Sequence, residues 1–285
     1  MARIASPPDP GLLSLNTATV REKWNLRQMI EGCARHAIAG ISPWRDKLAE
    51  LGAKEAARLI RDHGLTVTGL CRGGMFPAAE RQARRAAVDD NLRAIDDAAM
   101  LQAKCLVLVV GGLPPGSRDL AGARQMVRDG IGEILDHARN AGVPLAVEPL
   151  HPMYCADRAC VNTLSQALDL CEELGGKESG GLGVAVDAYH VWWDAELERQ
   201  IARTRSRLSS LLERAGELEL ASRECMEELR ARLSQQLHDT TDAIGRASRR
   251  RLAAAREVLD HLVAYHALLD QLLGYEAELS AGAMA

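Results

Sequence analysis

Short runs of apolar residues recur along the chain up to about residue 204, and between them lie longer segments whose apolar residues return every three or four positions. Because the short runs are continuously apolar, they predict β-strands buried on both faces, whereas the longer segments predict amphipathic helices. The predicted strands cover residues 11–16, 37–42, 65–71, 105–110, 143–147 and 182–186. The predicted helices cover residues 26–37, 54–63, 79–103, 120–140 and 163–174, and a sixth begins at residue 195.

Strands that alternate with helices predict an α/β fold, in which helices cover the outer face of a parallel sheet. The leading architecture is a (β/α)8-type TIM barrel that is incomplete, because only six strand–helix units are recognisable. A doubly wound open sheet is the alternative. Its dinucleotide-binding version is disfavoured, because no Gly-x-Gly-x-x-Gly motif follows the first strand.

The pattern changes after about residue 204. From residue 205 onward, apolar residues, mostly leucine, recur at three- and four-residue steps among arginine and glutamate, and no run could form a strand. This periodicity is typical of a helical hairpin or coiled coil. The chain is therefore predicted to have two parts, a partial barrel over 1–204 and an α-helical segment over 205–285.

Composition and charge exclude several classes of function. A net charge of −4 provides no basic surface for nucleic acid, and aromatic residues make up only 3%. No apolar run is long enough to span a membrane, and the amino terminus lacks the apolar core of a signal peptide. Seven cysteines, scattered through predicted helices and strands, are typical of reduced thiols in a cytoplasmic protein.

Two of the predicted strands end in the same way. The run 143–147 leads to Glu148, the run 182–186 leads to Asp187, and each acid is followed three residues later by a histidine. Because the carboxyl ends of barrel strands meet at one mouth, these acids are expected to lie close together. Two carboxylates suit a hard divalent metal such as Mn²⁺, Mg²⁺ or Co²⁺. The alternative is that each acid caps a helix or forms an ion pair.

Four further residues near predicted strand ends could contact a substrate. His190 and His151 could donate to a substrate hydroxyl or act in acid–base chemistry, or else be partly exposed loop histidines. Arg72 could bind an anionic or polyhydroxylated substrate, or form an ordinary ion pair. Trp44 could stack on a sugar, or simply pack in the core.

The chain from about residue 12 to 204 resembles the xylose-isomerase-like TIM barrel family of sugar isomerases and epimerases, which includes inosose-processing members. The most specific matching stretches are Ala-Val-Glu-Pro-Leu-His-Pro at 146–152 and Val-Asp-Ala-Tyr-His at 186–190. Weaker matches lie at 14–19, 41–46, 69–74 and 106–112.

This resemblance implies a divalent metal bound by Glu148 and Asp187, and a sugar or cyclitol substrate contacted by His190. It also implies proton transfer next to a carbonyl, with Glu148 as one acid–base group. The family carries further metal ligands, a histidine on a seventh strand and a glutamate on an eighth, and nothing in 205–285 can be assigned to them. Loss of one base of a two-base mechanism is expected to cost on the order of 10²–10⁴ in rate.

Two other functions are kept as hypotheses. The chain could be a non-catalytic partial barrel whose C-terminal helices assemble it into a homo-oligomer, and then it would hold no metal. It could instead be an abasic-site endonuclease on the same fold. The negative net charge and the short list of histidine ligands disfavour the endonuclease.

Overall fold

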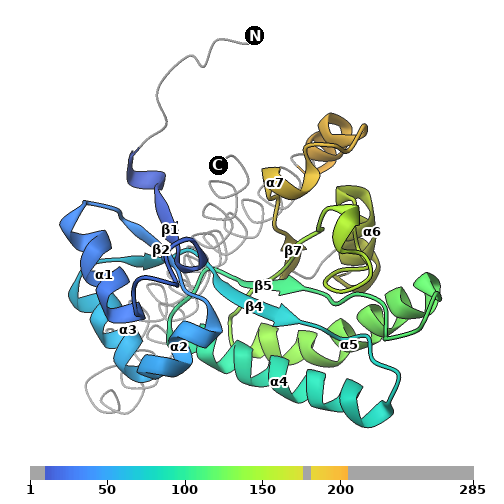
Figure 1. Cartoon of the computed structure of the whole chain (residues 1–285), viewed down its shortest axis with the longest axis horizontal. Helices are drawn as coiled ribbons and strands as arrows, with labels where there is room; N and C mark the ends of the chain where they lie inside the picture. Colours follow the sequence, from blue (N-terminus) through green and yellow to red (C-terminus); the bar gives the residue numbers. More distant parts are fainter. Residues whose placement is uncertain (1–9, 176–180, 205–285) are drawn as a thin grey trace, which may run out of the picture. The chain divides into compact units, whose positions relative to one another are not determined.

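The computed structural model describes residues 10–175 and 181–204 (Figure 1). Its strands form two sheets in which every pair is parallel. The first sheet has the order β1 (Ser14–Asn16), β2 (Gly40–Ser42), β3 (Thr66–Val67). The second has the order β4 (Leu70–Gly74), β5 (Leu106–Val109), β6 (Leu145–Val147), β7 (Leu182–Val184).

The two sheets are joined where β2 ends. A parallel bridge links Trp44 to Cys71, and the Cys71 N–H donates to the carbonyl oxygen of Pro43 at 2.9 Å. The strands therefore follow one another around the barrel in chain order. The predicted α/β fold of TIM-barrel type, built from six strand–helix units, is confirmed.

One predicted strand is divided. Residues 65–71 were expected to form a single strand, but β3 pairs with β2 while β4 pairs with β5. The change of partner occurs at Thr68 and Gly69. The Thr68 N–H still donates to the Ile41 carbonyl oxygen at 3.0 Å, whereas the Leu70 N–H donates to the Cys105 carbonyl oxygen at 2.9 Å. The Thr68 hydroxyl also bonds the Ser14 hydroxyl at 2.7 Å, and the Ser42 hydroxyl donates to the Gly69 carbonyl at 3.0 Å.

The predicted helices are present with small differences at their ends. They are α1 (Leu26–Arg35), α3 (Ala53–Asp62), α4 (Arg81–Met100), α5 (Leu120–Asn140) and α6 (Leu164–Gly175). Helical backbone resumes at residue 197 and continues to 204. Two short helices are not evident from the sequence, α2 (Arg45–Leu51) and α7 (Ala188–Val191), because each is too short to show a helical period of apolar residues. The same holds for the 3₁₀ turns η1 (Pro10–Leu12), η2 (Thr17–Thr19) and η3 (Pro152–Tyr154).

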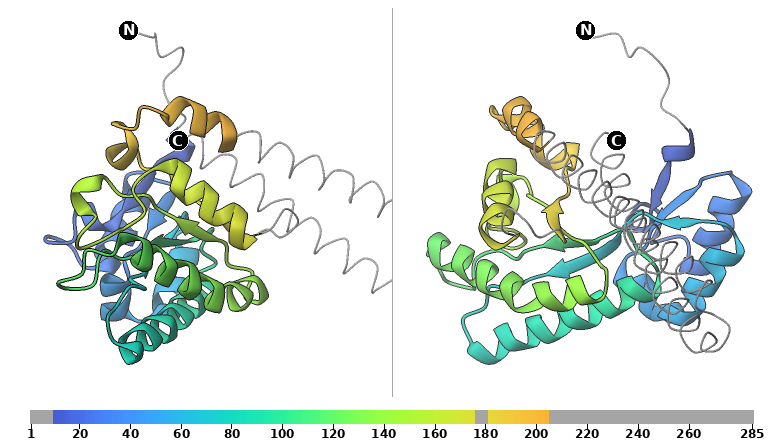
Figure 2. Two further views of the ribbon diagram at one scale, coloured as in Figure 1. Left: turned by 90° about the vertical axis from the view of Figure 1, so that its right-hand side faces the viewer. Right: turned by 180° about the vertical axis from the view of Figure 1, so that it is seen from behind.

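The core lies between the strands and the helices. Leu106, Leu108 and Leu145 of the second sheet are fully buried, as are Ile95 of α4 and Ile131 of α5. Helices α4 and α5 pack against each other and run along the β4–β5 strands, as the right-hand view of Figure 2 shows. This continuous apolar packing explains why the strands show no alternation of apolar and polar residues.

The sheet is open at both edges within residues 10–175 and 181–204, because β1 pairs only with β2 and β7 only with β6. The helical segment predicted for 205–285 lies outside the described residues, so the two-part division stays a prediction. No helix of the described part is long and apolar enough to cross a membrane. The six cysteines of this part are free thiols, as expected.

Candidate functional site

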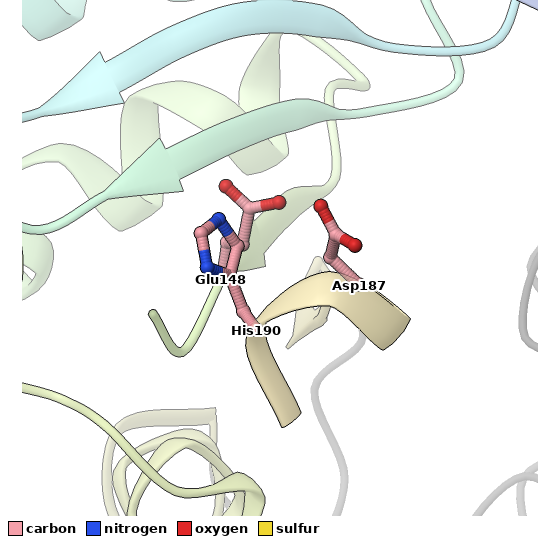
Figure 3. A group of neighbouring side chains, drawn as sticks. All are labelled: Glu148, Asp187 and His190. Carbon is pink, nitrogen blue, oxygen red and sulfur yellow. The ribbon is translucent and has the colours of Figure 1, made fainter. Parts of the chain in front are cut away.

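Glu148, Asp187 and His190 come together at one end of the sheet (Figure 3). One ligand atom from each side chain lies within 4.8 Å of the others. Glu148 follows β6, and Asp187 follows β7, which is the next strand in the sheet. Neighbouring parallel strands end at the same edge, and this is why residues far apart in sequence meet here. The proximity of the three side chains agrees with the sequence expectation.

Glu148 lies in a partly buried position with an unusual affinity for protons. Its backbone N–H donates to the Leu108 carbonyl oxygen at 3.1 Å, which holds it beside β5. The pKa of the Glu148 carboxyl is raised to about 7, first by burial and then by the negative charge of Asp187, while the positive charge of Arg72 acts in the opposite direction. Glu148 can therefore accept or release a proton near neutral pH.

Asp187 is also the N-cap of α7, because its Oδ1 accepts the Tyr189 N–H at 2.8 Å. The helix-cap interpretation considered from the sequence is thus correct for this residue. It does not exclude ligand binding, because an ionised carboxylate has a second oxygen that can accept. The cap orients the carboxylate at the start of the helix that carries His190.

His190 is held on three sides. Its Nδ1 accepts the His151 backbone N–H at 3.4 Å, and its ring meets the edges of Tyr154 and Tyr189 at centroid distances of 5.7 and 5.0 Å. Burial lowers the pKa of His190, against the opposing charge of Asp187. With Nδ1 accepting, the neutral tautomer inferred from this hydrogen bond carries its proton on Nε2.

His151 lies next to the site without joining the three-residue group. Its Nδ1 accepts the Met153 N–H at 3.2 Å and so caps η3, and its ring packs edge-on against Trp193 at 5.7 Å. Its contact with His190 runs through the backbone. His151 therefore lies beside the group, and its role in substrate binding stays a prediction.

Arg72 and Trp44 line a separate pocket of about 400 Å³. Trp44 follows β2, its backbone N–H donates to the Thr17 hydroxyl at 2.9 Å, and the Arg21 guanidinium lies 5.8 Å from its ring centre. Arg72 belongs to β4 and reaches the three-residue group through its charge on Glu148. Arg21 was not predicted to belong to a site, because the residues next to it in the sequence do not mark the end of a strand.

Two thiols also lie within electrostatic reach of Glu148. Burial raises the pKa of the Cys71 thiol to about 12 and of the Cys105 thiol to about 11, and the charge of Glu148 adds to both shifts. These cysteines stay protonated and inert at neutral pH. The sequence carried no signal for them, because a strand buried on both faces does not reveal which residues face the interior.

The sequence model of the xylose isomerase-like TIM barrel family matches residues 30–219. The chain belongs to this family. A protein of known structure, SMc04130 from Sinorhizobium meliloti 1021, is 57% identical, with 68% of this chain and 70% of that chain covered and a TM-score of 0.66.

Other solved structures share the barrel at lower identity. The apo form of 3-keto-D-glucoside 4-epimerase, YcjR, from E. coli is 21% identical, with 64% and 71% of the two chains covered and a TM-score of 0.54. The IolI protein with a bound zinc atom is 19% identical, with 66% and 67% covered and a TM-score of 0.56. At these identities the likeness establishes the fold alone. A comparison with curated proteins finds no match.

Proposed function

We propose that the chain is a divalent-metal-dependent sugar or cyclitol isomerase or epimerase that moves a proton next to a carbonyl. The observation that carries this proposal is the convergence of Glu148, Asp187 and His190 within 4.8 Å at the ends of neighbouring strands. Membership of the xylose isomerase-like family supports the enzyme class, since its neighbours of known structure include a 3-keto-D-glucoside epimerase.

The residues fit a divalent cation. The carboxylate oxygens of Glu148 and Asp187 form a hard donor set that suits Mn²⁺, Mg²⁺ or Co²⁺. The Nδ1 atom of His190 already accepts a backbone N–H, so this residue is left to contact the substrate. Burial raises the pKa of Glu148, and the negative charge of Asp187 adds to this shift. A cation between the two carboxylates would offset their repulsion. When bound, the cation would polarise a substrate carbonyl and so acidify the adjacent C–H. The zinc bound by the IolI protein makes a metal in this fold reasonable.

Glu148 and His190 divide the proton chemistry. Glu148 takes or returns the proton at a carboxylate oxygen. His190, neutral with its proton on Nε2, donates to a substrate hydroxyl and fixes the orientation of the sugar. His151 supports the substrate side of the site by positioning His190. Arg72 and Trp44 extend the binding surface along β4 and β2.

The second candidate is a non-catalytic partial barrel whose segment 205–285 assembles it into a homo-oligomer. One observation favours it: within the described residues, the metal-ligand group has only three members, all from the β6 and β7 ends. A metal bound by Glu148 and Asp187 needs further ligands or water to complete its shell.

Metal content separates the two candidates. Purified wild-type protein, Glu148→Gln and the control Glu80→Gln, which changes an exposed glutamate at the start of α4, are compared by elemental mass spectrometry after incubation with Mn²⁺ and desalting. About one Mn²⁺ per chain is expected in the wild type and in the control, and much less in Glu148→Gln. The absence of metal from all three proteins would reject the metal-dependent isomerase and favour the assembly function.

A further inference from the structure

The pocket between β2 and β4, here the Arg72 pocket, is lined by more arginines than acids. Its charged walls are Arg21, Arg45, Arg72, Asp46 and Asp90, and Trp44 and Met75 also line it. Its strand-end residues belong to the carboxyl ends of β2 and β4, the same ends at which Glu148 and Asp187 follow β6 and β7. The pocket therefore lies at the same end of the strands as the candidate site.

The three arginines of the pocket differ in how far a carboxylate already balances their positive charge. Arg45 is neutralised by Asp90 in a two-point ion pair, with distances of 2.7 Å and 3.0 Å. Within residues 10–175 and 181–204, the ion pair of Arg21 is with Glu22, at 3.3 Å, and the Glu22 side chain is 85% exposed, so water weakens this pair. The cation of Arg21 is therefore still able to attract an anion.

Arg72 is the least satisfied of the three. Its Nη1 donates to the Met75 sulfur at 3.3 Å, and a thioether is a weak acceptor. Within residues 10–175 and 181–204 no carboxylate lies within ion-pair distance of its guanidinium. A half-buried guanidinium has five donors and a planar shape that matches carboxylate and phosphate groups at two points. The Arg72 guanidinium is therefore suited to bind an oxyanion such as a carboxylate or a phosphate.

The position of Arg72 relates this pocket to the reacting end of a substrate. Arg72 is on β4 and Glu148 follows β6, so one strand, β5, lies between them. Two strand spacings amount to about 10 Å, which is comparable to the length of a six-carbon sugar with a terminal charged group. The charge of Arg72 acts on Glu148, which agrees with this proximity.

We infer that the Arg72 pocket binds an anionic group, a phosphate or a carboxylate, carried at the far end of the sugar substrate. Arg72 is the principal ligand of the anion, Arg21 supplies a second positive charge, and the half-buried ring of Trp44 offers an apolar wall to the sugar carbons. The inference rests on the proposed function because it takes the sugar to be a substrate. The anion site itself requires neither metal nor turnover.

Calorimetric titration tests the inference with three probes: D-fructose, D-fructose 6-phosphate and D-glucuronate. The proteins are the wild type, Arg72→Leu, Arg72→Lys and Arg118→Leu, which removes an exposed arginine in the loop before α5. All titrations are run with EDTA and repeated with Mn²⁺. At least one charged probe is expected to bind wild type about 10-fold more tightly than D-fructose, and the better probe identifies phosphate or carboxylate as the group.

Arg72→Leu is expected to remove this preference, Arg72→Lys to retain part of it, and Arg118→Leu to retain all of it. A purely structural role of Arg72 would weaken all three probes equally and would overturn the inference, as would equal binding of charged and neutral probes by the wild type. An Arg72-dependent preference in EDTA, in a protein that binds no Mn²⁺, would support the anion site while rejecting the proposed function.

Discussion

The two sheets of the barrel differ in whether their polar side chains have hydrogen-bond partners. In the β1–β3 sheet these groups satisfy one another, since the Ser14 and Thr68 hydroxyls bond each other and the Ser42 hydroxyl bonds a backbone carbonyl. In the β4–β7 sheet, the Glu148 carboxylate has no hydrogen-bond or ion-pair partner within the described residues, and it lies beside a second carboxylate, Asp187.

This difference separates groups that stabilise the fold from groups that wait for a ligand. A buried polar group with a partner contributes to stability, whereas a buried charge without one costs stability and is retained where chemistry uses it. The first sheet therefore acts as a scaffold, and the second carries the candidate site. Three experiments test this comparison, beginning with the largest expected effect.

Loss of Glu148 should abolish most of the proton transfer. Glu148→Gln keeps the size of the side chain but removes both its charge and its basicity, so the rate is expected to fall on the order of 10²–10⁴-fold. The measurement is deuterium incorporation from D₂O into a panel of ketoses and inososes, followed by mass spectrometry with Mn²⁺ present. Glu80→Gln should keep the wild-type rate. An unchanged rate in Glu148→Gln would remove this residue from the chemistry.

The same carboxyl should make stability depend on pH. Because the folded-state pKa of Glu148 is raised from 4.5 to about 7, its contribution to stability is fully present below about pH 4.5 and is lost as pH rises through about 7. Between pH 5 and pH 8, metal-free wild type should lose about 2–3 kcal/mol of unfolding free energy relative to Glu148→Gln.

Urea unfolding in EDTA at several pH values measures this difference. Parallel pH profiles for the two proteins would show that folding does not raise the pKa of Glu148. Adding Mn²⁺ should stabilise wild type more at pH 8 than at pH 5, because the cation competes with the proton for the same carboxylate.

The smallest effect is expected in the scaffold sheet. Thr68→Val keeps the shape of the side chain and removes the hydrogen bond to Ser14. The unfolding free energy should fall by about 1 kcal/mol, with Mn²⁺ binding unchanged. Urea unfolding and the metal assay are made on the same samples. A loss of metal binding without a loss of stability would mean that the two sheets are coupled, and the comparison would fail.

The sequence was sufficient to predict the strand positions and the long helices, because the apolar pattern of a segment is a local property that does not depend on which other segments it packs against. It was also sufficient for the pairing of Glu148 with Asp187, since acids that end successive parallel strands must meet at one edge. His190 followed from its spacing after Asp187. The assembly role and the helical nature of 205–285 stay predictions.

Other features depended on partners distant in sequence. The third strand is divided because β3 pairs with β2 while β4 pairs with β5, and a local apolar pattern contains no record of which strands will pair. The raised pKa of Glu148 requires its burial and the nearby charge of Asp187. Strength of desolvation and distance between charges are properties of the packed chain, so only the tertiary structure decided them.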